Sequence, residues 1–339
     1  MRKGRPLRAM RGRNTQLGLT LVELMIASAI ALAITAALVG VFVNSSRART
    51  ELDRSNRQIE SGRYAVELLS EELRVAGFFG EVQIDGATYA TPSACAVDAA
   101  QLGWSESPLR VPVPMQAIYA AQACLSDRAA GPVSSLNFAS PALAIRRLST
   151  SAIAPAAVAA GNDYVQVSAC KSDPIGTPLE IDGAASSFTL RSLDCATLAP
   201  VRRIMQRTYF IASCSNCGAD TIPSLKRVEM AGGALRLDTL VEGIEAIGLD
   251  LGFDTDNDGS PDAWRLTVDA LPGTSDWNNV MAVRLYVLSR TTEATAGYQD
   301  TKVYDLGLAG TVGPFNDGFK RRVYATVVRL NNPAGRREL

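Results

Sequence analysis

The segment from Leu24 to Val43 constrains the fold more than any other feature, because it contains no charged side chain. Its 20 residues match the ~20 that a helix needs to cross a hydrocarbon core of ~30 Å. Residues 1–18 precede it and contain six basic residues and no acidic one. Since positive charge is retained on the cytoplasmic side, the pattern predicts residues 1–18 inside, one membrane span, and the rest of the chain outside.

Glu23 is a carboxylate directly before the charge-free run. A carboxylate inside a membrane helix costs about 2.5–3.5 kcal/mol on insertion scales and therefore needs a positive partner. A helix N-terminus, with its unpaired N–H groups, supplies one. An ordinary secretory signal puts its apolar stretch before the cleavage site, whereas here it follows Gly18. A plain signal anchor with a basic tail is the alternative.

Residues 18–25, Gly-Leu-Thr-Leu-Val-Glu-Leu-Met, resemble the class III signal of type IV prepilins. The resemblance implies that a prepilin peptidase cuts after Gly18 and methylates the new N-terminal amine of Leu19. Most of the family has Phe where this chain has Leu19. The resemblance also implies that Glu23 docks the subunit onto the growing filament, that residues 19–43 lie in the lipid bilayer, and that an inner-membrane assembly platform is a partner.

Residues 44–77 are predicted to continue the same helix as an amphipathic half with one apolar face. The apolar residues that recur every seven positions are Leu52, Ile59, Val66 and Leu73. Gly62 weakens the helix by about 1 kcal/mol relative to Ala, and the helix is expected to end near Gly77. A coiled coil is the alternative explanation of the heptad.

The remainder is predicted to form a head with a variable loop and strand region at 78–160 and a β-rich region at 161–330. The expected strands are Tyr164–Val167, Arg207–Ala212, Leu235–Val241, Val280–Leu288 and Arg322–Leu330. Over Ile247–Phe253, strict alternation predicts a strand with one buried face. The fold class is α+β, a pilin-like lollipop with one long N-terminal helix packed on an antiparallel sheet. The polar tail 331–339 is expected to fray.

All six cysteines lie beyond the membrane span, which indicates disulfides in an oxidising periplasm. They are Cys95, Cys124, Cys170, Cys195, Cys214 and Cys217. Of the 15 possible pairings, we expect Cys214 with Cys217 and Cys170 with Cys195. A zinc knuckle or redox pair at Cys214 and Cys217 is a weak alternative, since structural zinc wants four ligands and the chain has no histidine.

Composition argues against an enzyme and against a nucleic-acid partner. Without histidine, no Ser-His-Asp or Cys-His site can form, and neither a P-loop nor a G-x-G-x-x-G in a strand–helix context is present. The chain has 34 basic and 34 acidic residues, and removing the six basic residues of the leader leaves 28 against 34. Such a mildly acidic surface lacks the basic stripe typical of nucleic-acid binding.

Residues 254–262, Asp-Thr-Asp-Asn-Asp-Gly-Ser-Pro-Asp, match the first nine positions of a calcium-binding loop. The candidate ligands are the side chains of Asp254, Asp256, Asp258 and Asp262 and the carbonyl of Ser260. Position twelve is Arg265, so the segment is not an EF-hand and resembles the shorter D-x-D-x-D-G-x-x-D loops of extracellular proteins. An acidic turn without a cation is the alternative.

Residues 74–80, 240–245 and 321–327 resemble PilW-type minor pilins. This resemblance implies a low-copy subunit that joins other minor pilins and the major pilin, primes pilus assembly, and sits at the tip, with roles in adhesion and twitching motility. It also implies an inner-membrane protein with a periplasmic head that later becomes extracellular in the pilus. A head this large would crowd a densely packed shaft, which independently favours the tip.

Two alternatives remain open from the sequence. A minor pseudopilin of a type II secretion system, similar to the J-type subunit, would share the leader, the helix and the sheet. A membrane-anchored periplasmic binding or adhesive module would instead keep residues 1–18.

Overall fold

A computed structural model of the chain describes residues 20–128, 140–173, 178–266, 277 and 279–337. Gly18 and Leu19 lie outside these residues. By its internal contacts the chain divides into two compact units, one ending at Asp53 and one beginning at Arg54. Each unit is described by itself below.

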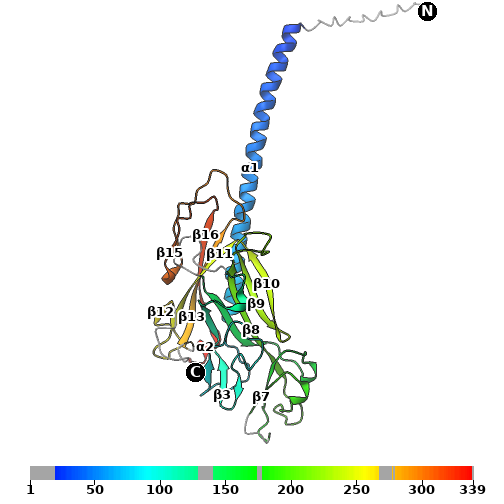
Figure 1. The fold of residues 1–339 in the computed structure, drawn as a ribbon, viewed down its shortest axis with the longest axis vertical. Helices are drawn as coiled ribbons and strands as arrows, with labels where there is room; N and C mark the ends of the chain where they lie inside the picture. The colour runs from blue at the N-terminus through cyan, green and yellow to red at the C-terminus, as the bar shows by residue number, and fades with distance from the viewer. Residues whose placement is uncertain (1–19, 129–139, 174–177, 267–276, 278, 338–339) are drawn as a thin grey trace, which may run out of the picture. The chain divides into compact units, whose positions relative to one another are not determined.

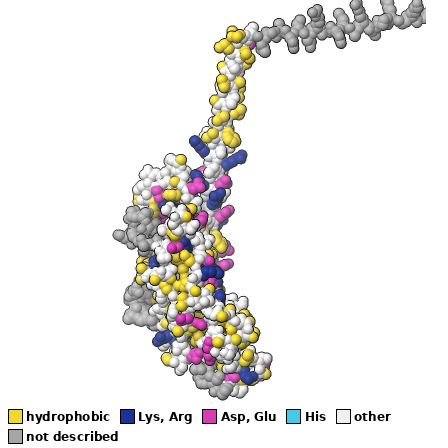
Figure 2. Space-filling model, turned by 45° about the vertical axis from the view of Figure 1, so that its right-hand side comes forward, with side chains coloured by type: hydrophobic (Ala, Val, Ile, Leu, Met, Phe, Trp, Pro, Cys, Tyr) yellow, Lys and Arg dark blue, Asp and Glu magenta, His cyan; other side chains and the backbone are white. Residues whose placement is uncertain are grey.

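The described part of the first unit is helical. The helix α1 runs from Leu21 to Arg74, and residues 21–50 are all exposed. Hydrophobic side chains cover this part of the helix, and Lys and Arg side chains occur only toward its C-terminal side (Figure 2). By length and composition α1 could cross a membrane, and it is the single such helix in the described part of the chain.

The second unit contains the C-terminal part of α1 and the β-rich head, as Figure 1 shows. The strands are β1 Thr88–Ala90, β2 Ser105–Glu106, β3 Leu109–Pro112, β4 Met115–Ile118, β5 Ala142–Leu148, β6 Tyr164–Val167, β7 Leu179–Asp182, β8 Val201–Ala212, β9 Ser224–Ala231, β10 Ala234–Glu242, β11 Ile244–Phe253, β12 Ala263–Arg265, β13 Val280–Arg290, β14 Tyr304–Asp305, β15 Thr311–Val312 and β16 Arg321–Arg329. The short helices are η1 Ala123–Leu125, η2 Pro155–Ala157, η3 Ala185–Ser187, η5 Gly307–Ala309 and α2 Asn331–Gly335.

Two antiparallel sheets form the body of the head. The larger has the order β10-β9-β8-β5-β4, and β6 and β7 extend it from β8; the second has the order β12-β11-β13-β16. A small sheet, β1-β3-β2, contains one parallel pair between β1 and β3, and β14 and β15 form a two-stranded ribbon. The α+β arrangement of one long helix on antiparallel sheets is therefore confirmed.

The C-terminal part of α1 packs on both large sheets through one apolar core. Ala65, Leu69 and Leu73 are fully buried there, together with residues from β5, β8, β11 and β13. Polar contacts add to this packing, since the Gln58 side chain donates to the carbonyls of Ser289 (3.1 Å) and Lys320 (2.9 Å). The heptad prediction was wrong at Leu52, which is 63% exposed, because the buried face follows a 3.6-residue helical repeat rather than a strict period of seven.

Gly62 has a role in packing, although glycine is unfavourable in a helix. It is buried on α1, and a Cβ built there would lie 2.2 Å from Cε2 of Tyr324 on β16. Real side chains do not approach this closely, so the Tyr324 ring occupies the space where a side chain would lie. The glycine therefore allows close approach of β16 to the helix.

Gly62→Ala is expected to destabilise the head by about 1–3 kcal/mol through overpacking, although alanine favours a helix by about 1 kcal/mol. In a Tyr324→Ala background the same change should be neutral or stabilising, because the obstruction is gone. Urea unfolding of the four proteins of this double-mutant cycle measures the difference. An equal loss in both backgrounds would contradict the assigned contact.

Strand β11 departs from the predicted single buried face, since all ten of its residues are buried. Ile247, Leu249, Leu251 and Phe253 lie in the core with α1. The second face is covered as well: Gly248 lies under the Leu306 carbonyl, and Gly252 lies beside Pro261 and Trp264. Glycines on that face let these neighbours approach closely. The alternation of large apolar residues with small or polar ones therefore does not mark an exposed face of the strand, because both faces are buried.

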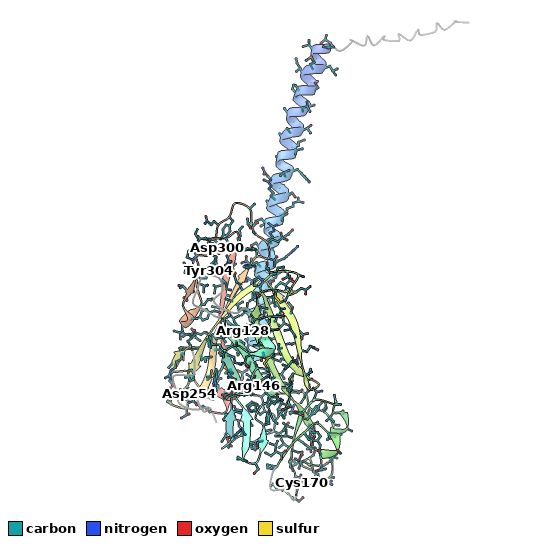
Figure 3. The ribbon with its side chains drawn as sticks, viewed as in Figure 1. Arg128, Arg146, Cys170, Asp254, Asp300 and Tyr304 are labelled. Carbon is teal, nitrogen blue, oxygen red and sulfur yellow. A yellow bond between two sulfur atoms is a disulfide. The ribbon has the colours of Figure 1, made fainter. Side chains whose placement is uncertain are left out.

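Arg146 is the largest fully buried side chain and comes from β5 (Figure 3). Its guanidinium donates to the Gln206 Oε1 (2.6 Å), the Gln116 Oε1 (3.1 Å) and the Pro92 carbonyl (3.0 Å), all neutral acceptors. Burial lowers the pKa of Arg146 to about 9. The dipoles of these three acceptors thus stabilise the buried cation among β4, β8 and the segment that contains Pro92.

The expectation that the C-terminal tail frays was wrong over residues 331–337. Helix α2 carries the buried residues Pro333 and Ala334. The Asn332 side chain donates to the Ala76 carbonyl (3.1 Å), which lies just beyond the end of α1. The tail is held because its apolar positions and side-chain donors meet the end of α1.

Candidate functional site

Glu23, the predicted docking residue, lies at the N-terminus of α1. Its Oε2 accepts hydrogen bonds from the backbone N–H (3.0 Å) and the hydroxyl (3.0 Å) of Thr20, while the Glu23 N–H donates to the Thr20 hydroxyl (3.2 Å). This reciprocal arrangement is a capping box, which satisfies N–H groups that have no partner within the helix. The spacing Thr-x-x-Glu before an apolar run is a known signal for it, although the capping box was not among the features predicted from the sequence.

The cysteines form three disulfides. Cys170 is joined to Cys195 and Cys214 to Cys217, the pairs named from the sequence, and Cys95 is joined to Cys124. No cysteine is free. The Cys95–Cys124 bond ties together two segments that lie over the larger sheet, because Ala94 and Leu125, next to these cysteines, share a core cluster with Phe210 of β8.

The acidic loop follows β11 and precedes β12. One carboxylate oxygen from each of Asp254, Asp256 and Asp262 lies within 4.8 Å of the other two. Asp258 lies outside this set, and its Oδ1 accepts the N–H of Ser260 (2.7 Å). The structure therefore brings together three of the four predicted carboxylates, and those three would provide oxygen ligands of the kind that Ca²⁺ prefers.

Asp254 is the buried member of the loop (Figure 3). Although burial alone would raise its pKa, hydrogen bonds from Arg337, Gly259 and Asn257 hold the pKa of Asp254 at about 2. The Arg337 Nη1 lies 2.8 Å from the Asp254 Oδ2. Asp256 and Asp262 are exposed, and neither forms an ion pair with a described residue. Arg337 thus compensates one of the three clustered carboxylates, and the other two have no ion-pair partner among the described residues.

A second charge cluster, which no sequence motif indicated, holds the segment 291–320 on the second large sheet. The Arg321 guanidinium, 1% exposed, pairs with Glu245 (2.5 Å), Asp300 (3.0 Å) and Asp317 (2.6 Å). Asp300 also accepts a hydrogen bond from the Tyr304 hydroxyl (2.9 Å), and the two residues lie side by side (Figure 3). Although burial would lower it, hydrogen bonds with Asp317 and Glu245 raise the pKa of Arg321 above its usual range.

These features define a class of protein. An exposed apolar N-terminal helix continues into a disulfide-bonded β-rich head, which fits a membrane-anchored protein. Residues 208–332 match the family model of PilW, the Type IV Pilus-assembly protein W. This part of the chain is therefore similar to PilW, which supports a type IV pilus-related protein, and PilW is a pilus-assembly component rather than a known enzyme family. The match runs from β8 to α2 and so includes the acidic loop and the Arg321 cluster.

No curated protein sequence and no solved structure matches the chain.

Proposed function

We propose that this protein is a minor pilin of a type IV pilus, cut after Gly18 by a prepilin peptidase and methylated on Leu19. It joins other minor pilins and the major pilin in the complex that primes assembly, and it sits at the pilus tip. The observation that carries the proposal is the PilW match over residues 208–332 on a chain whose helix α1 is apolar and exposed over residues 21–43. The match also favours a pilus over a type II secretion pseudopilin.

A strain lacking this protein tests the priming role. Surface piliation and twitching should be strongly reduced, and both should return when the gene is supplied in trans. Normal piliation and motility in the deletion strain would overturn the role. A strain complemented with a Glu23→Ala variant is a further comparison. This variant should keep a folded head but fail to enter the filament, so it distinguishes loss of the head from loss of filament entry.

We propose further that the loop 254–262 binds calcium. The support is that Asp254, Asp256 and Asp262 bring three carboxylate oxygens together. Asp256 and Asp262 have no compensating cation among the described residues. Extracellular modules bind calcium with Kd values of roughly 10⁻⁴–10⁻³ M, so millimolar calcium would fill the site.

Adding calcium to the full chain in detergent, at about ten times Kd, should stabilise it by about 1.4 kcal/mol and raise Tm by roughly 2–5 °C. Asp256→Asn should abolish this rise, because it removes one charged ligand. Asp194→Asn is the matched control: Asp194 is also an exposed aspartate that accepts backbone N–H groups, and it lies outside the loop. Identical Tm values in calcium and in chelator would count against the site.

A further inference from the structure

Strand β16 forms one edge of the second large sheet, and among the described residues no strand pairs with its outer side. Strand β16 is last in the order β12-β11-β13-β16, and β13 is its single strand partner among the described residues. The register between them is unbroken from Arg321 opposite Arg290 to Arg329 opposite Ala282. The strand contains no proline. It is thus a long, regular edge strand.

Its outward backbone groups can be assigned from the ladder. The N–H of Leu330 donates to the Met281 carbonyl, and the N–H of Thr291 donates to the Lys320 carbonyl, at the two ends of the β13–β16 pair. Because antiparallel ladders alternate bonded and non-bonded pairs, the even-numbered residues of β16 bond to β13. Val323, Ala325 and Val327 therefore direct their N–H and C=O groups away, and these groups have no partner in the described part of the chain.

Natural proteins usually protect such edges with charges, bulges or proline. The outer strand of the larger sheet, β10, has this protection, with a bulge between Thr239 and Val241 and the charged residues Arg236 and Asp238. The middle of β16 lacks it. Ala325 is exposed, and Val327 is 61% exposed, so the free backbone row is flanked by small apolar side chains.

The charges of β16 indicate its partner. The strand has three arginines and no acidic residue, with Arg322 and Arg329 exposed near its two ends. Pairing with β16 of a second copy would bring only like charges together, which is unfavourable across strands. We propose that β16 accepts, as an added strand, an extended segment of a different chain, β-branched in its centre and acidic at its ends.

A synthetic probe tests this on the full chain in detergent. The probe is a labelled peptide of about seven residues with alternating valine and threonine and a glutamate at each end. Fluorescence anisotropy should show saturable binding. A peptide with lysine at each end should bind at least about tenfold more weakly, and so should one whose alternate amides are N-methylated.

Ala325→Pro gives the matched protein variant. It removes an N–H that does not bond to β13, so the fold is retained as in natural edge strands with proline, while peptide affinity should fall about tenfold or more. Val327→Glu provides a second block that leaves the backbone unchanged, because its carboxylate would lie close to the acidic end of the peptide. An unaltered Tm checks that each variant is folded.

Three results would overturn the proposal. Equal binding of the N-methylated peptide would exclude strand pairing, and equal binding of the lysine-ended peptide would exclude acidic recognition. A dimer of the full chain that Ala325→Pro dissociates would identify a second copy as the partner. The peptide measurement needs no pilus, so it can fail while the proposed pilus role stands.

Discussion

Arg321→Ala is expected to lower the free energy of unfolding of the head by about 3–5 kcal/mol. The substitution removes a cation that pairs with both Glu245 and Asp300, whose side chains are 6% and 0% exposed. Two carboxylates would then be buried with reduced compensation, and the segment 291–320 would lose one of its attachments to β11 and β16. Removing one partner of a buried ion pair is costly for this reason, even where the intact pair adds little stability.

The neighbouring Arg322→Ala is the control for this change. Arg322 is exposed on the same strand, and exposed substitutions usually change stability by less than about 0.5 kcal/mol. Arg321→Lys should lie between the two, since an ammonium keeps the charge but cannot make the same forked contacts. Urea unfolding of the full chain in detergent, followed by fluorescence, compares all three. A loss in Arg321→Ala no larger than that in Arg322→Ala would contradict the assigned network.

Glu23→Ala and Glu23→Gln are both expected to reduce the amount of this protein in sheared pili by about tenfold or more. This matches the 1.5–3 kcal/mol of a lost charge-assisted hydrogen bond. The structure makes the glutamine variant informative, because Glu23 already forms a capping box with Thr20. Glutamine can replace glutamate in such a box, but it cannot pair by charge with the amine of a neighbouring subunit.

The two variants therefore separate two roles of one carboxylate. If Glu23 acts in docking, both variants fail to enter the pilus while the membrane content of the protein stays normal. If it only begins the helix, Glu23→Gln enters pili like the wild type and Glu23→Ala does not. Quantitative immunoblots of pili and membranes distinguish these outcomes, and the second would contradict the docking role.

Much of the fold follows from local patterns in the sequence. The charge-free run predicts α1, and strands β6, β8, β10, β11, β13 and β16 all overlap predicted segments. β5 and β9 were not predicted as separate strands, because Arg146, Arg147, Lys226 and Glu229 interrupt their apolar patterns. In the folded chain Arg146, Lys226 and Glu229 have polar partners on neighbouring strands or loops, which a local pattern cannot show.

The candidate sites also divide into features that local sequence spacing predicts and features that depend on long-range contacts. The Asp254–Asp262 spacing is local and could be read directly, as could the short Cys214–Cys217 loop. The Arg337 contact with Asp254 joins positions 83 residues apart, and Arg321 reaches Glu245 across 76. Such contacts depend on the tertiary arrangement, so a single sequence gives no signal for them.

The mass of the mature N-terminus, measured on the protein recovered from purified pili, tests the central claim most directly. The proposed minor-pilin role predicts a polypeptide that begins at Leu19, carries one methyl group on its amine, and is present at low copy in the pilus fraction. A chain that retains residues 1–18, or one that is found in membranes and never in pili, would contradict it.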